Sequence, residues 1–118
     1  VIIRIARSEM GQGTLTGLAQ MVAEELECDW AKVKTEYPTP GQNLARDRIW
    51  GSFATGGSQG IRGSHDYVRQ GGAVARQMLI EAAADAPEAT IANAVVRVEA
   101  EFEGKAAVDV AIPLKVVK

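Results

Sequence analysis

Residues 1–26 read VIIRIARSEMGQGTLTGLAQMVAEEL, and this stretch indicates a strand, a glycine-bearing turn and a helix in that order. Residues 1–6 are mostly β-branched and apolar, which is typical of a strand buried on at least one face. A polar turn follows at 7–13, and residues 14–26 then place apolar side chains along a single helical face. Glutamates crowd the end of this helix, where the helix dipole disfavours them, so we expect packing to hold it.

Downstream, the sequence predicts a second strand and a second long helix. Residues 33–37 alternate in polarity like a strand, after a short turn that Asp29 can cap. Residues 60–84 repeat apolar side chains at three- and four-residue steps, which predicts one helix. The glycines inside it each cost about 0.8–1 kcal/mol relative to alanine. We interpret them as points where a neighbouring backbone or a ligand comes close.

Two C-terminal strands complete the predicted fold. Residues 95–102 alternate cleanly, and Gly104 with Lys105 suggests a hairpin turn into a strand over 107–117. Pro113 implies that this last strand is an edge strand or carries a bulge. The order strand, helix, strand, loop, helix, strand, strand predicts an α+β fold, a mixed α/β sandwich in which two main helices pack on a small mixed sheet.

The connection over residues 38–59 is predicted to be long and irregular. A structureless connection beyond about 12–15 residues is uncommon in a compact domain and is usually functional or disordered. The apolar side chains embedded in it, Leu44, Ile49, Trp50 and Phe53, argue against disorder. We therefore expect this loop to be ordered by contacts with the rest of the chain.

Composition bounds the protein class. The 118 residues carry a formal net charge of −2 and are 47% hydrophobic, which suits one globular domain over residues 1–118. The balanced charge gives no reason to expect nucleic acid or an anionic membrane as partner. No apolar run approaches the roughly 20 residues of a membrane span. The single cysteine, Cys28, excludes a disulfide framework and a cysteine-rich metal or iron–sulfur site. Because Val1 already stands inside an apolar run, we expect the chain to be a piece of a longer protein.

A glycine- and arginine-rich stretch is the first candidate for binding. Between residues 42 and 76 the charges are five arginines against two aspartates, and arginine suits bidentate phosphate contacts. Residues 55–60, TGGSQG, lead into the predicted second helix, where glycines and a helix start can present unpaired backbone donors. This pattern favours an anion cradle. The alternative is a flexible loop with Ser58 as the helix N-cap and solvated arginines.

A second glycine-bearing turn, residues 11–17, invites a dinucleotide-binding interpretation. Glu36 lies near the distance at which an acid would meet a ribose, about 20 residues on. However, three residues rather than two separate Gly13 from Gly17, and the chain lacks repeated βα units. The sequence therefore does not favour this interpretation.

No catalytic group or metal-ligand cluster stands out. His65 is the only histidine, and Asp66 beside it is expected to point elsewhere on the helix. Cys28 follows three glutamates and precedes Asp29, an acidic patch that would raise the pKa of its thiol. Trp30 is interpreted as part of the core. We predict a binding surface with no catalytic residue and no metal ligand.

Two blocks resemble a known family. Residues 7–14, RSEMGQGT, and residues 50–65, WGSFATGGSQGIRGSH, are similar to segments of the molybdenum-cofactor-binding large subunit of the xanthine oxidase family. The likeness is closest to the bacterial aldehyde and isoquinoline oxidoreductases. Residues 22–38, between the blocks, fit as well, so the resemblance covers residues 1–84 as a cofactor-binding segment. Residues 85–118, the C-terminal strands, are not matched.

The resemblance implies an oxidoreductase that hydroxylates aldehydes or N-heterocycles with oxygen from water and passes electrons to a [2Fe–2S] subunit or domain. The implied cofactor is molybdopterin, in its cytosine dinucleotide form. Gln12 would supply a hydrogen-bonding side chain to the pterin, and amides at both helix entrances would face its negatively charged tail. The cofactor-binding residues carried over are Met10, Gly11, Gln12, Gly13, Thr55, Gly56, Gly57 and Ser58.

The chain departs from the family in the segments that it lacks, the one with the catalytic glutamate and other segments that contact the cofactor. The family's active-site glutamate lies in a glycine-rich segment that residues 85–118 do not resemble. We therefore expect part of the cofactor site, no turnover by this chain alone, and completion by further segments of the large subunit. Two alternatives stay open: a non-enzymatic scaffold or interaction domain with the same fold, and a generic phosphate- or nucleotide-binding domain. Cytoplasmic and periplasmic localisation are both compatible with the sequence.

Overall fold

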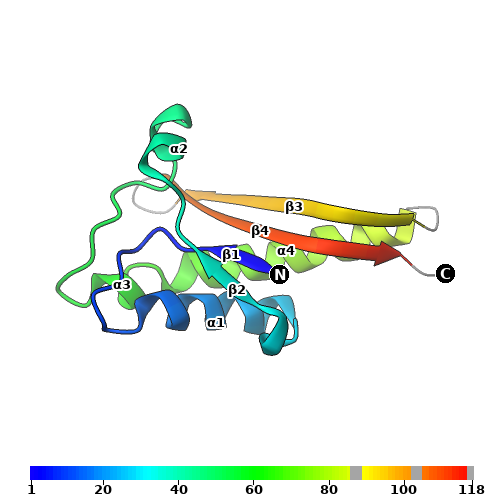
Figure 1. The fold of residues 1–118 in the computed structure, drawn as a ribbon, viewed down its shortest axis with the longest axis horizontal. Helices are drawn as coiled ribbons and strands as arrows, with labels where there is room; N and C mark the ends of the chain where they lie inside the picture. The colour runs from blue at the N-terminus through cyan, green and yellow to red at the C-terminus, as the bar shows by residue number, and fades with distance from the viewer. Residues whose placement is uncertain (86–88, 102–104, 117–118) are drawn as a thin grey trace.

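The computed structural model describes residues 1–85, 89–101 and 105–116. Figure 1 shows the order of the elements along the chain. They are β1 (Ile2–Arg4), α1 (Thr14–Leu26), the 3-10 turn η1 (Trp30–Lys32), β2 (Lys34–Glu36), α2 (Pro40–Ala45), α3 (Gln59–Arg62), α4 (His65–Asp85), β3 (Ala89–Glu101) and β4 (Lys105–Val116).

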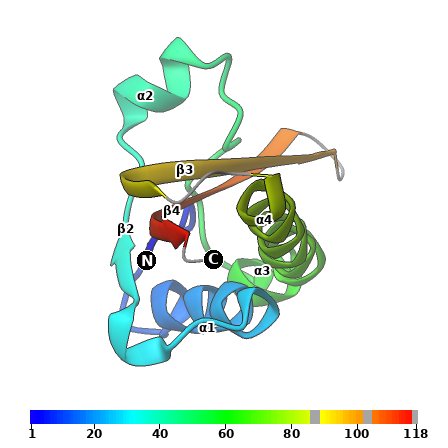
Figure 2. The same ribbon diagram turned by 90° about the vertical axis from the view of Figure 1, so that its right-hand side faces the viewer.

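The four strands form one mixed sheet. Their order is β2-β1-β4-β3, with β1 parallel to β2 and antiparallel to β4, and with β3 antiparallel to β4. The two long helices, α1 and α4, lie against each other on one side of this sheet (Figure 2). The predicted α+β fold, two main helices on a small mixed sheet, is confirmed.

The core lies between β1, α1 and α4. Its fully or nearly fully buried side chains are Ile3, Ile5, Leu18, Ala19, Val22, Ala23, Leu26, Val68 and Ala75. The two helices approach so closely that a Cβ added to Gly72 would lie 2.7 Å from the backbone oxygen of Val22. Here a glycine inside α4 admits a neighbouring backbone, which is the role expected of it.

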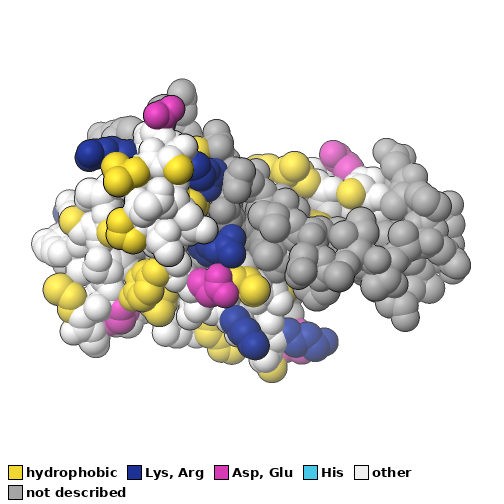
Figure 3. Space-filling view, turned by 45° about the horizontal axis from the view of Figure 1, so that its top comes forward, with side chains coloured by type: hydrophobic (Ala, Val, Ile, Leu, Met, Phe, Trp, Pro, Cys, Tyr) yellow, Lys and Arg dark blue, Asp and Glu magenta, His cyan; other side chains and the backbone are white. Residues whose placement is uncertain are grey.

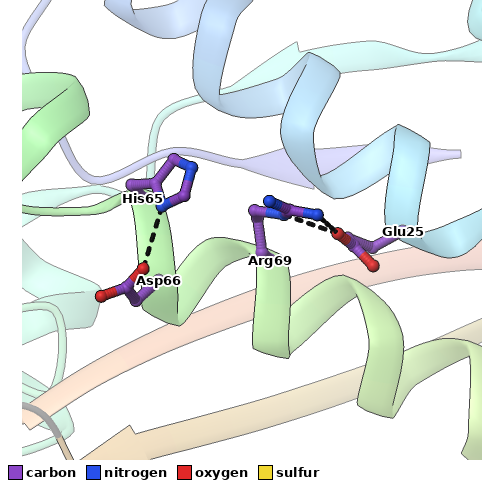
Figure 4. Close-up of polar contacts among 4 residues, drawn as sticks. All are labelled: Glu25, His65, Asp66 and Arg69. Carbon is purple, nitrogen blue, oxygen red and sulfur yellow. Dashed lines mark hydrogen bonds and ion pairs between the residues drawn. The ribbon is translucent and has the colours of Figure 1, made fainter.

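Charges on α4 compensate the glutamates at the end of α1. The Arg69 guanidinium donates to the Glu25 carboxylate at 2.6 Å, and Arg76 donates to Glu27 at 2.7 Å. The first of these pairs is drawn in Figure 4. Packing thus holds α1, as expected, and arginines from the neighbouring helix add to it at the end where the dipole disfavours acids.

The prediction of one continuous helix over residues 60–84 is wrong, because the chain breaks between α3 and α4. Gly63 ends α3 and is a poor helix former. The next residue, Ser64, is fully buried, and its hydroxyl oxygen accepts hydrogen bonds from Arg7 and Tyr67, at 2.9 Å each. A tertiary contact therefore fixes the break.

The connection over residues 38–59 is ordered, as expected, but it is not wholly irregular. The short helix α2 projects from the body of the molecule (Figure 1), and a capping box between Thr39 and Gln42 starts it. The side chain of Asn43 then ties the loop together: its oxygen accepts from the Trp50 amide at 3.0 Å and its nitrogen donates to the Gly51 carbonyl at 2.9 Å. Ile49 and Trp50 are buried in a small second cluster.

The C-terminal strands pair as a hairpin, with Glu101 opposite Lys105. The predicted turn at Gly104 lies outside the described residues. Strand β4 is not an edge strand, because it lies between β1 and β3. The register of β3 against β4 shifts between Ile91 and Ala94, opposite Pro113, so the predicted bulge is confirmed. At Pro113 the missing N–H costs little because β1 pairs only with residues 109–111.

The surface of the described part carries both signs of charge. On the face in Figure 3, basic side chains are scattered among acidic ones and do not form a stripe. Trp30, predicted to lie in the core, is 43% exposed because the η1 turn lies outside the cluster between β1, α1 and α4. None of the described helices combines the length and the apolar character that crossing a membrane requires.

Candidate functional site

Two loops meet at the entrances of the helices. The first loop (residues 7–13) joins β1 to α1, and the second loop (residues 51–58) precedes α3. The backbone amide and the hydroxyl of Ser8 both donate to the Phe53 carbonyl. Arg7 donates to the Ala54 carbonyl at 3.2 Å while its Nε holds the buried Ser64 hydroxyl. The residues that precede the glycines therefore fasten the two loops together.

A glycine at the start of α3 brings the loops into contact. A Cβ added to Gly60 would lie 2.8 Å from the Oγ1 of Thr14 and 2.8 Å from the Oγ1 of Thr55. Thr14 opens α1 and Thr55 belongs to the second loop. Any larger residue at position 60 would force these two hydroxyls, and hence the two loops, apart.

A hollow of about 370 Å³ lies between the loops. Its lining residues are Met10, Gln12, Thr14, Thr55, Gly56, Ser58, Gly60 and Ile61. The structure thus brings together residues from both sequence blocks that the family resemblance singled out. Three of the predicted site residues, Gly11, Gly13 and Gly57, lie in the same loops but not on the wall of the hollow.

The amides of the first loop already hold an anion, the carboxylate of Glu9. Its Oε1 accepts from the amides of Gly11 and Gly13 at 2.7 and 2.9 Å, and its Oε2 accepts from Leu15 at 3.0 Å. The hydrogen bonds from Leu15 and Gly13 lower the pKa of Glu9. These three amides are therefore not available to a ligand, in contrast to what the sequence led us to expect of the first helix entrance.

The side chain of Gln12 braces the same loop. Its nitrogen donates to the Ser8 carbonyl at 3.0 Å and to the Thr14 hydroxyl at 2.8 Å, and its oxygen accepts from the Met10 amide at 2.6 Å. Both N–H donors are thus engaged, and the oxygen keeps one acceptor lone pair. The Met10 side chain is 72% exposed, so it forms an accessible apolar part of the wall.

The second loop is open. The amides of Gly56, Gly57 and Ser58 donate no hydrogen bond to any described residue. Gly57 and Ser58 have φ values of 53° and 64°, so consecutive amides turn within a left-handed bend. Ser58 is the N-cap residue of α3, as the alternative expects, but its side chain makes no capping hydrogen bond. Since α3 spans only 4 residues, the available donors are those of the loop itself rather than of a helix dipole.

Comparisons with known proteins identify the family. A family model described as a molybdopterin cofactor-binding domain matches residues 1–114. The chain belongs to this family. Both loops and the hollow between them therefore lie within the matched region.

Two curated relatives agree with this assignment. The chain is 38% identical over 81 residues, 69% of its length, to a membrane-bound aldehyde dehydrogenase [pyrroloquinoline-quinone] of Gluconacetobacter polyoxogenes. It is 36% identical over 77 residues, 64% of its length, to the isoquinoline 1-oxidoreductase subunit beta of Brevundimonas diminuta. The chain spans about 10% of the length of each of these two relatives. No solved structure matches it.

The residues of this molybdopterin cofactor-binding domain fit part of such a cofactor. The hollow is within the size range of small-molecule sites, about 300–1,000 Å³. It offers hydroxyls from Thr55 and Ser58 beside the open amides, and these match a ligand rich in hydrogen-bond acceptors. None of the five arginines counted between residues 42 and 76 lines it. Arg46, for example, stacks over Trp50, with its guanidinium carbon 4.4 Å from the ring centroid. The predicted arginine cluster is therefore dispersed.

The His65–Asp66 pair lies outside this hollow. His65 Nδ1 is 2.9 Å from Asp66 Oδ1 (Figure 4), so the expectation that Asp66 points elsewhere is wrong. Both residues lie in the first turn of α4, where no preceding helical turn restricts their rotamers. The imidazole borders a groove with Gln20, Glu24 and Arg69 that contains none of the predicted site residues.

Neither a metal cluster nor a reactive thiol is found in the described part. No group of three or more His, Cys, Asp or Glu side chains among the described residues could hold a metal ion. Burial raises the pKa of the Cys28 thiol, and the Asp29 carboxylate adds a smaller effect in the same direction. The direction agrees with the sequence analysis, but desolvation rather than the acidic patch is the main cause.

Four residues that organise the site were missed by sequence reasoning. Arg7 and Ser64 tie the loops to α4, Gly60 lets the loops meet, and Glu9 holds the first loop. Only Glu9 left a signal, because an acid two residues before a Gly-x-Gly turn can reach its amides. The other three residues contact partners that are far away in the sequence, and no local sequence pattern indicates such contacts.

Proposed function

We propose that this domain holds the pterin of a molybdenum hydroxylase in the hollow between its two loops, as part of an oxidoreductase for aldehydes or N-heterocycles. The observation that carries the proposal is the row of open amides at Gly56, Gly57 and Ser58, next to a wall formed by Met10 and Gln12. Membership of the molybdopterin cofactor-binding family supports the choice of ligand. The names of the two curated relatives support the substrate classes.

Each part of the hollow has a distinct proposed role. The amides of Gly56–Ser58 and the hydroxyls of Thr55 and Ser58 donate hydrogen bonds to the pterin and its phosphate. Met10 covers an apolar part of the ring system and excludes water from it. Gln12 accepts a hydrogen bond through its remaining lone pair. Gly11 and Gly13 act indirectly, by giving the first loop its left-handed turns, and Gly57 gives the second loop such a turn besides offering its amide.

The finer features of the cofactor are also proposals. When bound, molybdopterin supplies a molybdenum ion that exchanges electrons with the substrate. The proposed form is the cytosine dinucleotide, and the proposed partners are other segments of the large subunit and a [2Fe–2S] subunit or domain. The residues of this domain bind and orient the cofactor, and the catalytic groups are proposed to come from elsewhere in the assembly.

Cofactor retention by side-chain variants tests the proposal. We expect Ser58→Ala and Thr55→Val, in the assembled enzyme produced in cells that make molybdopterin, to retain less molybdenum and pterin after dialysis. One hydrogen bond contributes about 0.5–1.5 kcal/mol net, so each variant should bind the cofactor about two- to tenfold more weakly. Molybdenum is measured by plasma mass spectrometry and the pterin by fluorescence after oxidation. Thr16→Ala, on the exposed face of α1, is the matched control. Equal retention in all three variants would contradict the proposed site.

A further inference from the structure

We propose that Glu9 is a positioning residue, whose carboxylate acts as a built-in anion that folds the first loop and so sets Met10 and Gln12 on the wall of the hollow. The consequence for cofactor binding rests on the proposed function. The folding of the loop around Glu9 does not, because it depends on contacts within the domain alone.

The carboxylate of Glu9 holds three amides with both of its oxygens. Gly11 and Gly13 donate to one oxygen and Leu15, in the first turn of α1, donates to the other. Gly11 and Gly13 have φ values of 99° and 80°, so each adopts a left-handed conformation that aims its amide inward. A single side chain thus defines the path of the loop from residue 11 to residue 15.

Glu9 also supplies the cap that α1 lacks. The N-cap position is Gly13, which makes no side-chain hydrogen bond to the first turn. The amides at a helix start need acceptors, and an anion there is favoured by the dipole. Because Glu9 satisfies Leu15 from a distance of six residues, the start of α1 and the shape of the loop depend on the same carboxylate.

The two wall residues lie between the residues that Glu9 holds. Met10 separates Glu9 from Gly11, and Gln12 separates Gly11 from Gly13. The Met10 amide donates to the Gln12 oxygen at 2.6 Å, which links the two wall residues to each other. If Glu9 released its amides, both would lose the fixed neighbours that keep them on the lining of the hollow.

The contact depends on the charge of Glu9. Because hydrogen bonds to its charged form lower the pKa of Glu9, these bonds stabilise the folded loop above the ordinary glutamate pKa, about 4.3. That stability is lost as the pH falls through the lowered pKa of the folded state. The charged group nearest in sequence, Arg7, is engaged with Ser64 and Ala54, and the Glu9 amide donates to the Tyr37 hydroxyl.

The first arm of the test is an acid titration of the 118-residue chain, followed through the amide resonances by ¹⁵N NMR. We expect the amides of Gly11, Gly13 and Leu15 to shift together, with a midpoint below the ordinary glutamate value. Glu9→Gln should abolish this titration, and Glu9→Ala should also speed solvent exchange of the three amides at least about tenfold. Glu24→Gln, at an exposed position of α1, should leave all three unchanged. Amides that titrate independently of Glu9 would overturn the proposal.

The second arm measures cofactor retention in the assembled enzyme. We expect Glu9→Ala to lower molybdenum and pterin retention about tenfold or more, with Glu9→Gln intermediate because it keeps one acceptor oxygen. Loss in Ser58→Ala together with full retention in Glu9→Ala would overturn the positioning role and leave the proposed function intact. Loss in Glu9→Ala with a preserved thermal transition and full retention in Glu24→Gln supports the role of Glu9. Full retention in every variant would contradict the proposed function itself.

Discussion

At the scale of single residues, the hollow depends on groups that are small or already satisfied. Gly60 leaves room for the hydroxyls of Thr14 and Thr55 on either side of it, and Glu9 occupies the amides of the first loop. In the described part of the chain, the amides of Gly56–Ser58 remain without an acceptor. The two loops therefore differ: the amides of the first loop that Glu9 holds are satisfied internally, and the amides of Gly56–Ser58 in the second loop are open.

Replacement of Gly60 tests the contact between the loops. A Cβ there would meet both threonine hydroxyls at 2.8 Å, so Gly60→Ala should lower the free energy of unfolding by about 1–3 kcal/mol. It should also weaken cofactor retention. Urea denaturation followed by circular dichroism measures the first effect. Gly41→Ala is the control, because its Cβ would have only an ordinary contact, with Thr39 Oγ1 at 4.0 Å. Equal stability of both variants would mean that the loops tolerate separation.

Cys28 provides a residue-scale prediction about pH. Since burial raises the pKa of its thiol, the reactive thiolate is scarcer at neutral pH than in a free cysteine. Alkylation by iodoacetamide should therefore be slower than that of glutathione at pH 7.5, and the midpoint of its pH–rate profile should lie above the ordinary cysteine value. Asp29→Asn should lower that midpoint only slightly, because Asp29 makes the smaller contribution. A midpoint below the ordinary value would contradict the burial found here.

At the scale of elements, the close approach of α1 and α4 keeps the two helix entrances side by side. Gly72 allows this approach because its Cα lies against the backbone of Val22. Arg69 and Arg76 then pair with the glutamates at the end of α1. Exposed pairs of this kind contribute little, about 0–1 kcal/mol each, so backbone proximity is the stronger determinant.

Gly72→Ala should therefore destabilise the domain although alanine is the better helix former. The added methyl would lie 2.7 Å from the Val22 carbonyl, a backbone atom, so the helices must move apart. We expect a net loss of about 1–2 kcal/mol, after the gain of about 1 kcal/mol in helix propensity. In Gly17→Ala, the matched control, the methyl would meet only the Ile61 Cδ1 tip at 3.1 Å. Thermal unfolding of both variants measures the effect. An unchanged or higher Tm for Gly72→Ala would show that the helices can separate without loss of stability.

The elements also show what sequence patterns can and cannot predict. Strand β1 and helix α1 follow from apolar periodicity, because each buries one face, and the pairing of β3 with β4 follows from the alternating sequence and the turn signal at Gly104 and Lys105. Helix α2 was missed although Thr39 and Gln42 form a recognisable capping box. The break after Gly63 could not be predicted, since it depends on Arg7 reaching Ser64 from 57 residues away.

The site was predictable only in part, for the same reason. Its two loops stand out through their glycines and the family resemblance, and they meet at one hollow. The internal use of the first loop's amides could not be foreseen, because it depends on the loop path around Glu9. The count of arginines was misleading: Arg69 and Arg76 serve the contact between helices rather than the hollow.

At the scale of the whole molecule, the loops and both helix entrances gather at one end, on the left in Figure 1. A larger depression, about 620 Å³, lies at the other end of α1 and contains none of the predicted site residues. The sheet and the two long helices form a frame that holds the loops. In the proposed function the domain forms one wall of a cofactor site, with its open donors concentrated on Gly56–Ser58.

The most direct test is a structure of the assembled, cofactor-loaded enzyme that contains this domain. We expect cofactor acceptor atoms within about 3.2 Å of the amide nitrogens of Gly56, Gly57 or Ser58. We also expect the Glu9 carboxylate still to accept hydrogen bonds from the amides of Gly11 and Gly13. A cofactor bound to the amides of Gly11 and Gly13 in place of Glu9, or one that makes no contact with residues 55–58, would contradict these expectations.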